Sequence, residues 1–390
     1  MRISFDEREL FRLCCIKPSV LIHQQGEKLM RIMIAILLTV TAAVSTSAQK
    51  ISKPTLTAKE CTSAQMNIIR EGIALHDAKK YDAAVEKYEI VRTDNPDCTL
   101  AIYEVSMTYY AMGEKTKAME TAYAGSKYKS EELPLFYLVM GNVIDDIGKP
   151  DEAVTIYRDA IKMLDGDPDK ARYLASLHFN LGVTFAKQKK HHEARAELKK
   201  AVEYNYEYAS PNYLLSLMYR DSNYKVPAFL AAARFLAMEL TSQRSVVASQ
   251  IIRDVLKPAQ KNDKTGNIDI FVNLDAPKDE GDFAMFELFL GTLTTVKGKE
   301  DKSKTEEEMF VKAVGTLIAL VAENKGVGST FVGKNYVPFL TEMKNRGYGE
   351  VLAYVVLHHT GSDVARSWLN SNQSILKDFA AWVKAYRPPR

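Results

Sequence analysis

Along residues 66–240, small and apolar residues recur at helical spacing in units of about 34 residues. In each unit a glycine or serine is followed, twelve positions later, by an alanine. Two helices pack closely only where both faces lack bulky side chains, so each pair predicts the crossing point of an antiparallel helical hairpin. The five pairs are Gly72 with Ala84, Ser106 with Ala118, Gly141 with Ala153, Gly182 with Ala194, and Ser216 with Ala228.

The first unit also carries larger residues at fixed distances from the small ones. Tyr81 and Tyr88 lie where they fill the space beside the crossing point, and Pro96 lies where it ends the second helix. This pattern resembles the tetratricopeptide repeat. The resemblance implies an all-α fold, in which about five hairpins stack into an α-solenoid over residues 65–240. The fifth unit is a weaker match, because Pro227 lies inside its second arm.

Residues 241–390 have a different pattern, which predicts a smaller helical module with at most one short strand. Residues 258–266 read as a polar linker, and residues 267–275 alternate apolar and polar side chains as a strand does. The only evident partner for that strand is the stretch 330–332, so an extended arm across helices is the alternative. Helices are expected at 242–257, 282–295, 305–323, 336–346, 350–359, 364–369 and 375–386.

The N-terminal region carries the pattern of a secretory signal peptide at residues 30–48. A basic residue, Arg31, precedes an apolar run that is too short to span a bilayer as a helix, and small residues follow it up to Ala48. We expect cleavage after Ala48, an exported product in the periplasm or outside the cell, and a linker at residues 49–64. An uncleaved anchor is the alternative. Residues 1–29 are unpatterned and are expected to be a non-native or extended N-terminus.

The charge balance changes little after the expected cleavage. Residues 1–48 contain six Lys or Arg and four Asp or Glu, so the formal charge falls from +3 to +1. A nucleic-acid-binding protein usually shows a concentrated basic face. A nearly neutral chain gives no indication of a nucleic-acid partner, and no further apolar run predicts a membrane-spanning segment in the exported product.

Two cysteines, Cys61 and Cys98, remain after the expected cleavage. They precede the first helices of neighbouring units and therefore lie at the same end of the predicted stack. An oxidising compartment would permit a disulfide between them, provided that the loop carrying Cys61 bends toward its partner. Two unpaired cysteines are the alternative.

The resemblance also implies a binding surface. In tetratricopeptide solenoids the first helix of each hairpin lines the concave side, where a protein or peptide ligand lies. Apolar and aromatic residues at the matching positions suit an extended peptide or an amphipathic helix. The expected groove residues are Ile69, Ile73, Tyr103, Met107, Tyr110, Leu138, Asn142, Phe179, Asn180, Tyr213 and Arg220.

Three alternatives to a peptide groove remain open. A clamp for a partner's C-terminal carboxylate is disfavoured, because Ile69, Tyr103, Leu138 and Phe179 stand where such a clamp places its cations. A glycan-binding accessory protein would use Tyr103, Tyr110, Phe179 and Tyr213 as stacking platforms. The third alternative is that the chain's own C-terminal segment covers the groove.

No pattern predicts catalysis, a cofactor or a metal. His191 with His192, and His358 with His359, are adjacent along a helix, so their side chains diverge and do not share an ion. No nucleophile elbow, phosphate loop or dinucleotide fingerprint occurs. We therefore expect a non-catalytic scaffold. An enzyme with its site in the C-terminal module is a further hypothesis, without a motif to support it.

Overall fold

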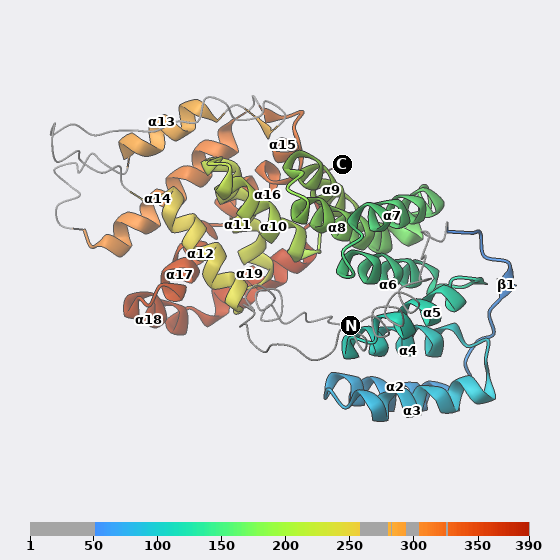
Figure 1. Cartoon of the computed structure of the whole chain (residues 1–390). Helices are drawn as coiled ribbons and strands as arrows, with labels where there is room; N and C mark the ends of the chain where they lie inside the picture. Colours follow the sequence, from blue (N-terminus) through green and yellow to red (C-terminus); the bar gives the residue numbers. More distant parts are fainter. Residues whose placement is uncertain (1–50, 258–279, 282, 294–303, 325–326, 390) are drawn as a thin grey trace, which may run out of the picture. The chain divides into compact units, whose positions relative to one another are not determined.

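The computed structural model describes residues 51–257, 280–281, 283–293, 304–324 and 327–389 of the chain (Figure 1). These residues are mainly helical and confirm the expected all-α class. Residues 50–390 form one compact unit. Three predicted segments lie outside the described residues: the extension at 1–29, the signal peptide at 30–48 and the strand at 267–275.

Ten helices form five consecutive hairpins, which Figure 1 shows in chain order from blue to yellow-green. The second helix of each of the first four hairpins contacts its hairpin partner and the helix that begins the next hairpin. The hairpins are α2 (Ser63–Asp77) with α3 (Tyr81–Asp94), α4 (Thr99–Met112) with α5 (Lys115–Gly125), α6 (Leu133–Asp146) with α7 (Pro150–Leu164), α8 (Ala171–Lys187) with α9 (His191–Tyr204), and α10 (Ala209–Asp221) with α11 (Lys225–Met238). A 3-10 turn, η2 (Pro168–Lys170), precedes α8.

The small residues found in the sequence lie where the paired helices cross. A Cβ atom on Gly141 would lie 2.2 Å from the Tyr157 ring, and one on Gly72 would lie 2.4 Å from the Tyr88 ring. Contacts this short are forbidden, so glycine allows the ring of the second helix to lie directly on the backbone of the first. The alanines twelve positions later in all five hairpins are fully buried. The predicted crossing points are therefore correct.

The turns between paired helices repeat as well. In every hairpin, one residue just after the first helix has a positive φ, which reverses the chain direction. Glycine adopts this conformation readily, whereas lysine and asparagine do so at a cost. The five residues are Lys79, Gly113, Gly148, Lys189 and Asn223.

The segment before α2 was expected to be a linker, but it forms a strand. β1 (Leu56–Thr57) pairs in parallel with β2 (Tyr128–Lys129), which follows the second hairpin. A disulfide joins Cys61 to Cys98, with a Cα–Cα distance of 5.5 Å. The backbone N–H of Lys59 donates to the Asp97 carbonyl at 3.0 Å. The segment is therefore fastened to the ends of the first two hairpins.

The C-terminal region is helical, as predicted, but residues 330–332 are not a strand. Thr330 caps a short helix, since its hydroxyl oxygen accepts from the Gly333 N–H at 3.0 Å. The prediction of a strand partner there is wrong, because the capping residue and the turn start a helix. The helices are α12 (Gln243–Val255), α13 (Ala284–Leu293), α14 (Glu306–Glu323), α15 (Phe331–Asn335), α16 (Val337–Asn345), α17 (Gly349–His359), α18 (Asp363–Ser371) and α19 (Gln373–Ala385).

The fifth hairpin shares its core with this C-terminal region. Every residue of α11 from Val226 to Ala237 is buried. The Tyr206 hydroxyl donates to the Asn335 carbonyl at 2.6 Å, and the Tyr336 hydroxyl donates to the Asn212 side chain at 2.8 Å. One hydrophobic cluster runs from α9 to α19. Residue 240, where the sequence predicted a boundary, therefore lies inside a continuous core.

Arg234 of α11 is the largest fully buried side chain among the described residues. Its guanidinium lies 4.1 Å from the Tyr206 ring centroid and 4.5 Å from that of Phe339, while Nη2 donates to the Tyr206 carbonyl at 3.0 Å. Phe339 packs edge-on against Tyr386, which directly follows α19. A guanidinium stacks well on aromatic faces, so this cluster ties α11 to α16 and α19.

Candidate functional site

The first helices α2, α4, α6 and α8 contact one another in sequence and present what we call the first-helix face. Most of the predicted groove residues on these helices are partly exposed. Arg220 on α10 is exposed. The partly exposed residues are Ile73, Met107, Tyr110, Leu138, Asn142, Phe179 and Asn180.

Three predicted groove residues are buried, so their assignment to an exposed surface is wrong. Ile69 is 0% exposed and belongs to the core of the first hairpin. Tyr103 packs against Phe136 of the next hairpin, with ring centroids 6.2 Å apart. Tyr213 packs against Phe235 of its own hairpin at 5.1 Å. Repeat spacing gives a position in the helix, but the size of the neighbouring residues decides its exposure.

This burial also weakens the glycan alternative. Tyr103 and Tyr213 were two of its four stacking platforms. Phe179, a third, packs against the ring of Tyr208 at 5.1 Å. The fourth, Tyr110, is held by a hydrogen bond from its hydroxyl to the Asp146 carboxylate at 2.7 Å. Since a sugar ring needs an open aromatic face, we do not propose this function.

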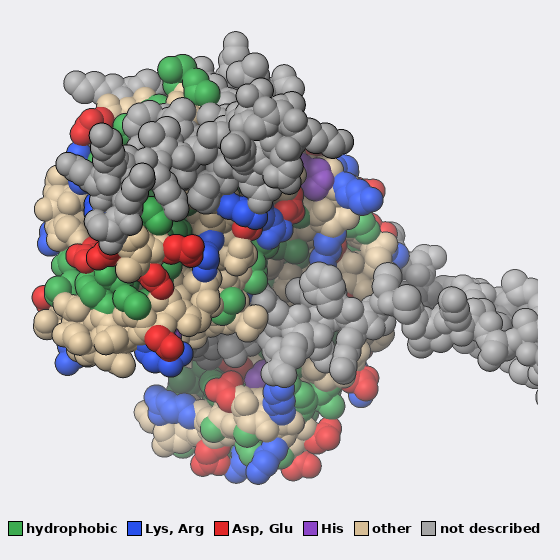
Figure 2. Space-filling model, turned by 90° about the vertical axis from the view of Figure 1, so that its left-hand side faces the viewer, with side chains coloured by type: hydrophobic (Ala, Val, Ile, Leu, Met, Phe, Trp, Pro, Cys, Tyr) green, Lys and Arg blue, Asp and Glu red, His purple; other side chains and the backbone are tan. Residues whose placement is uncertain are grey.

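The two aspartates at the end of α6, Asp145 and Asp146, form ion pairs with lysines of neighbouring helices. Lys187 Nζ lies 2.7 Å from Asp145 Oδ2 and 3.7 Å from Asp146 Oδ1, and Lys115 Nζ lies 3.2 Å from Asp146 Oδ2. Figure 2 shows the same mixture on the face it presents, where acidic and basic side chains are interspersed among the coloured atoms. These exposed pairs contribute little stability, but they leave neither charge in excess near α6.

The side chain of Asn142 is partly engaged by a hydrogen bond from its own hairpin. The Tyr157 hydroxyl donates to its side-chain oxygen at 2.6 Å, so that oxygen is fixed and the amide N–H groups remain as donors. Asn180 lies one hairpin further on, where it is partly exposed and its side chain makes no hydrogen bond within the described residues. Amides at such positions suit a peptide backbone.

A polar cluster that the sequence analysis missed lies between the first two hairpins. Glu104 of α4 is 6% exposed, and Tyr88 of α3 is fully buried. His76 Nδ1 lies 2.8 Å from the Thr108 hydroxyl, which donates to the Glu104 carbonyl at 2.8 Å. Asp77 ends α2 beside them. The available signal was Glu104 itself, because it is the only charged residue in an otherwise apolar helix.

The electrostatics of this cluster are unfavourable for negative charge. Burial, with a smaller contribution from Asp77, raises the pKa of Glu104 to about 7. Burial lowers the pKa of His76, so the imidazole there tends to be neutral. Near neutral pH Glu104 is therefore close to its own midpoint, and the fold supplies no cation to hold it ionised.

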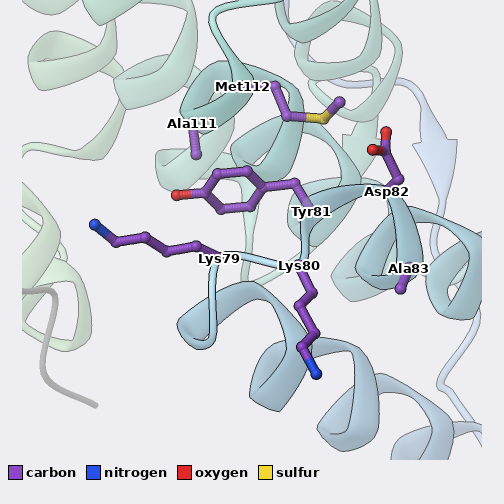
Figure 3. Close-up of a pocket in the computed structure, with 7 residues that line it drawn as sticks. All are labelled: Lys79, Lys80, Tyr81, Asp82, Ala83, Ala111 and Met112. Atoms are coloured by element: carbon purple, nitrogen blue, oxygen red, sulfur yellow. The ribbon is translucent and has the colours of Figure 1, made fainter.

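A shallow pocket of about 570 Å³ lies at the turn of the first hairpin. Tyr81, Ala111 and Met112 line it together with two lysines (Figure 3). The ammonium groups of Lys79 and Lys80 point in different directions, so they do not converge on a bound anion. The Tyr81 ring meets the His76 ring edge-on at 5.2 Å, which places the pocket beside the polar cluster.

The two pairs of adjacent histidines lie on α9 and α17. No group of three or more His, Cys, Asp or Glu side chains that could hold a metal occurs within the described part of the chain. His359 instead bonds the Leu240 carbonyl through Nε2 at 2.7 Å. In the same residues, no helix is both long and apolar enough to span a membrane.

Comparison with known proteins identifies the repeat. Residues 175–208, which run from within α8 to the residue before α10, match the family model of the tetratricopeptide repeat. With four further hairpins of the same build, α2 to α11 form a tetratricopeptide-type solenoid. No curated protein sequence matches the chain.

Several solved structures resemble part of the chain. A thermophilic tetratricopeptide protein of Thermus thermophilus is 21% identical, with a TM-score of 0.41, over 48% of this chain and 98% of its own. PilW, a type IV pilus biogenesis factor, is 16% identical at 0.42, over 50% and 87%. PilF of Pseudomonas aeruginosa is 16% identical at 0.41, over 49% and 86%. The class assignment depends on the matched repeat and the hairpin geometry.

Proposed function

We propose that this chain is an exported, non-catalytic scaffold that binds a segment of another protein across the first-helix face. The observation that carries this proposal is the partly exposed apolar lining of α2, α4 and α6. Ile73, Met107 and Leu138 lie on three successive first helices. Aliphatic and thioether side chains contribute contact area to a peptide or an amphipathic helix, and the amides of Asn142 and Asn180 supply hydrogen bonds.

The proposal of export depends on the signal-peptide pattern at residues 30–48 and is supported by the disulfide. Disulfides persist in oxidising compartments and are rare in the reducing cytosol. Cys61 and Cys98 are bonded, and the bond fastens the segment that directly follows the expected cleavage site. Fractionation of cells that express the full chain should place the protein outside the cytoplasm, with Gln49 as its first residue by mass spectrometry. A cytoplasmic product that retains residues 30–48 would refute export.

Binding is tested by a pair of substitutions on one helix. Leu138→Asp places a charge on the first-helix face of α6. Ile147→Asp places the same charge just after that helix, at a side chain that is already 45% exposed. With thermal unfolding measured for both variants, Leu138→Asp should abolish co-purification of the partner and Ile147→Asp should not. Equal binding by both variants would contradict the use of this face.

A further inference from the structure

The buried carboxylate of Glu104 lacks a counter-charge. Its side-chain Oε1 is inaccessible to solvent and has no hydrogen-bond partner among the described residues. Moving an ionised carboxylate out of water is costly unless a cation or hydrogen-bond donors compensate for it. The other two buried acids among the described residues, Glu280 and Glu287, do have such a partner. Glu280, for example, pairs with Lys199 and accepts from the Tyr219 hydroxyl. Glu104 is therefore an exception.

The groups that face Glu104 from neighbouring helices come from α2 and α3 and supply no positive charge. Asp77 and the largely neutral His76 face it from α2, and Tyr88 faces it from α3. The Tyr88 hydroxyl is buried beside that of Thr108. Lys79 and Lys80, the nearest cations along the chain, form no ion pair with Asp77 or Glu104 within these residues.

The position of Asp77 adds to the unfavourable negative charge. It is the last residue of α2, and a helix C-terminus carries a partial negative charge that disfavours a carboxylate. The acids at the end of α6 overcome the same disadvantage by pairing with Lys115 and Lys187, whereas Asp77 forms no ion pair with any residue that the structure describes. The seam between α2 and α4 thus places the exposed carboxylate of Asp77 near the buried, unpaired carboxylate of Glu104. Ile73 and Met107 lie partly exposed on the same two helices.

We propose that this seam accepts a lysine or arginine side chain of the bound segment. Glu104 and Asp77 receive the ammonium or guanidinium group, and Ile73 and Met107 contact the apolar residues beside it. The inference rests on the proposed function, and it specifies the partner as a basic, apolar segment. Charge complementarity supports it, because a cation placed there supplies the counter-charge that the fold omits.

A library of random ten-residue peptides displayed on phage provides the probe. It would be selected against the exported chain from Gln49 and against the variants Glu104→Gln and Glu86→Gln. The first variant keeps the shape of the side chain and removes its charge. The second makes the same change on α3, at an exposed residue, and serves as the control. Unfolding curves of all three proteins establish that each is folded.

We expect the wild-type chain and Glu86→Gln to select peptides in which lysine or arginine lies beside leucine, methionine or phenylalanine. Glu104→Gln should bind the selected peptide at least about tenfold more weakly. Replacing the selected lysine by norleucine should cost a similar factor in the wild-type chain and almost nothing more in Glu104→Gln. Peptide binding that is indifferent to both changes would overturn this inference alone. Failure of the wild-type chain to select any peptide would overturn the proposed function as well.

Discussion

The first four hairpins and the fifth are built on the same pattern but meet different surroundings. In the first four, the first helices keep partly exposed apolar residues such as Met107 and Leu138. In the fifth, α11 is buried along its whole length and shares one core with α12 to α19. The same repeat therefore leaves an apolar surface partly exposed in the first four hairpins, whereas in the fifth hairpin it packs against the C-terminal helices.

The second helices of the hairpins differ in how many apolar residues they carry, and this difference decides whether a hairpin is buried. In the fifth hairpin, every residue of α11 from Val226 to Ala237 is buried, Arg234 included. The corresponding second helices α3 and α9 bury only a narrow stripe of residues. A hairpin whose second helix is apolar on all sides must be covered on both sides. The C-terminal helices supply that cover.

The largest expected effect on stability comes from removing the Arg234 contacts that join the fifth hairpin to the C-terminal helices. Arg234→Ala removes a buried side chain, its stacking on Tyr206 and Phe339, and a hydrogen bond. We expect a loss of about 4 kcal/mol in the free energy of unfolding, measured by urea denaturation. The exposed Arg220→Ala should change it by less than about 0.5 kcal/mol. Similar values for both variants would show that the aromatic cluster does not hold the C-terminal region.

A somewhat smaller effect, with a defined pH dependence, is expected in the first two hairpins. The pKa of Glu104 is raised from 4.5 to about 7, so the folded state retains a proton that the unfolded state loses. This stabilisation is fully present below pH 4.5 and is lost as the pH rises through about 7. Relative to Glu104→Gln, the wild-type chain should therefore lose up to about 3 kcal/mol of stability between pH 4.5 and 8. A constant difference across this range would contradict the buried, unpaired state of Glu104.

The third prediction concerns the packing that all five hairpins share. Gly141→Ala drives a methyl group into the Tyr157 ring, so we expect a cost of about 2 kcal/mol in chemical denaturation. Gly315→Ala is the matched control, because it lies in the helix α14 with no atom within 4 Å of the added Cβ. That change should be neutral or stabilising by up to about 1 kcal/mol. If both variants behave alike, close helix crossing does not limit the stack.

The hairpins were predictable because their decisive contacts are local and periodic. The small residue of one helix and the ring of the next, as in Gly72 with Tyr88, lie sixteen positions apart and recur along the chain. The cluster around Arg234 was not predictable in this way. Its ring Phe339 lies more than a hundred residues away, and nothing in the local pattern around either residue specifies the other.

The candidate site was predictable only in part. Repeat spacing predicts that Met107 and Leu138 lie on a shared face, and both are partly exposed. It failed for Tyr103 and Tyr213, whose exposure depends on the rings of Phe136 and Phe235 on neighbouring helices. Exposure is set by the volume of the side chains that meet a residue, and periodicity alone carries little information on that volume.

The central claim is that the open hairpins bind a partner on their first helices. Site-specific photocrosslinking in living cells tests it most directly. A photoreactive residue would replace Met107 or Leu138 on the first-helix face, or Ile90, which is 53% exposed on the second helix α3. The account predicts one shared adduct at positions 107 and 138 and none at position 90. Adducts at position 90 alone, or no adduct at either position on the first-helix face, would contradict it.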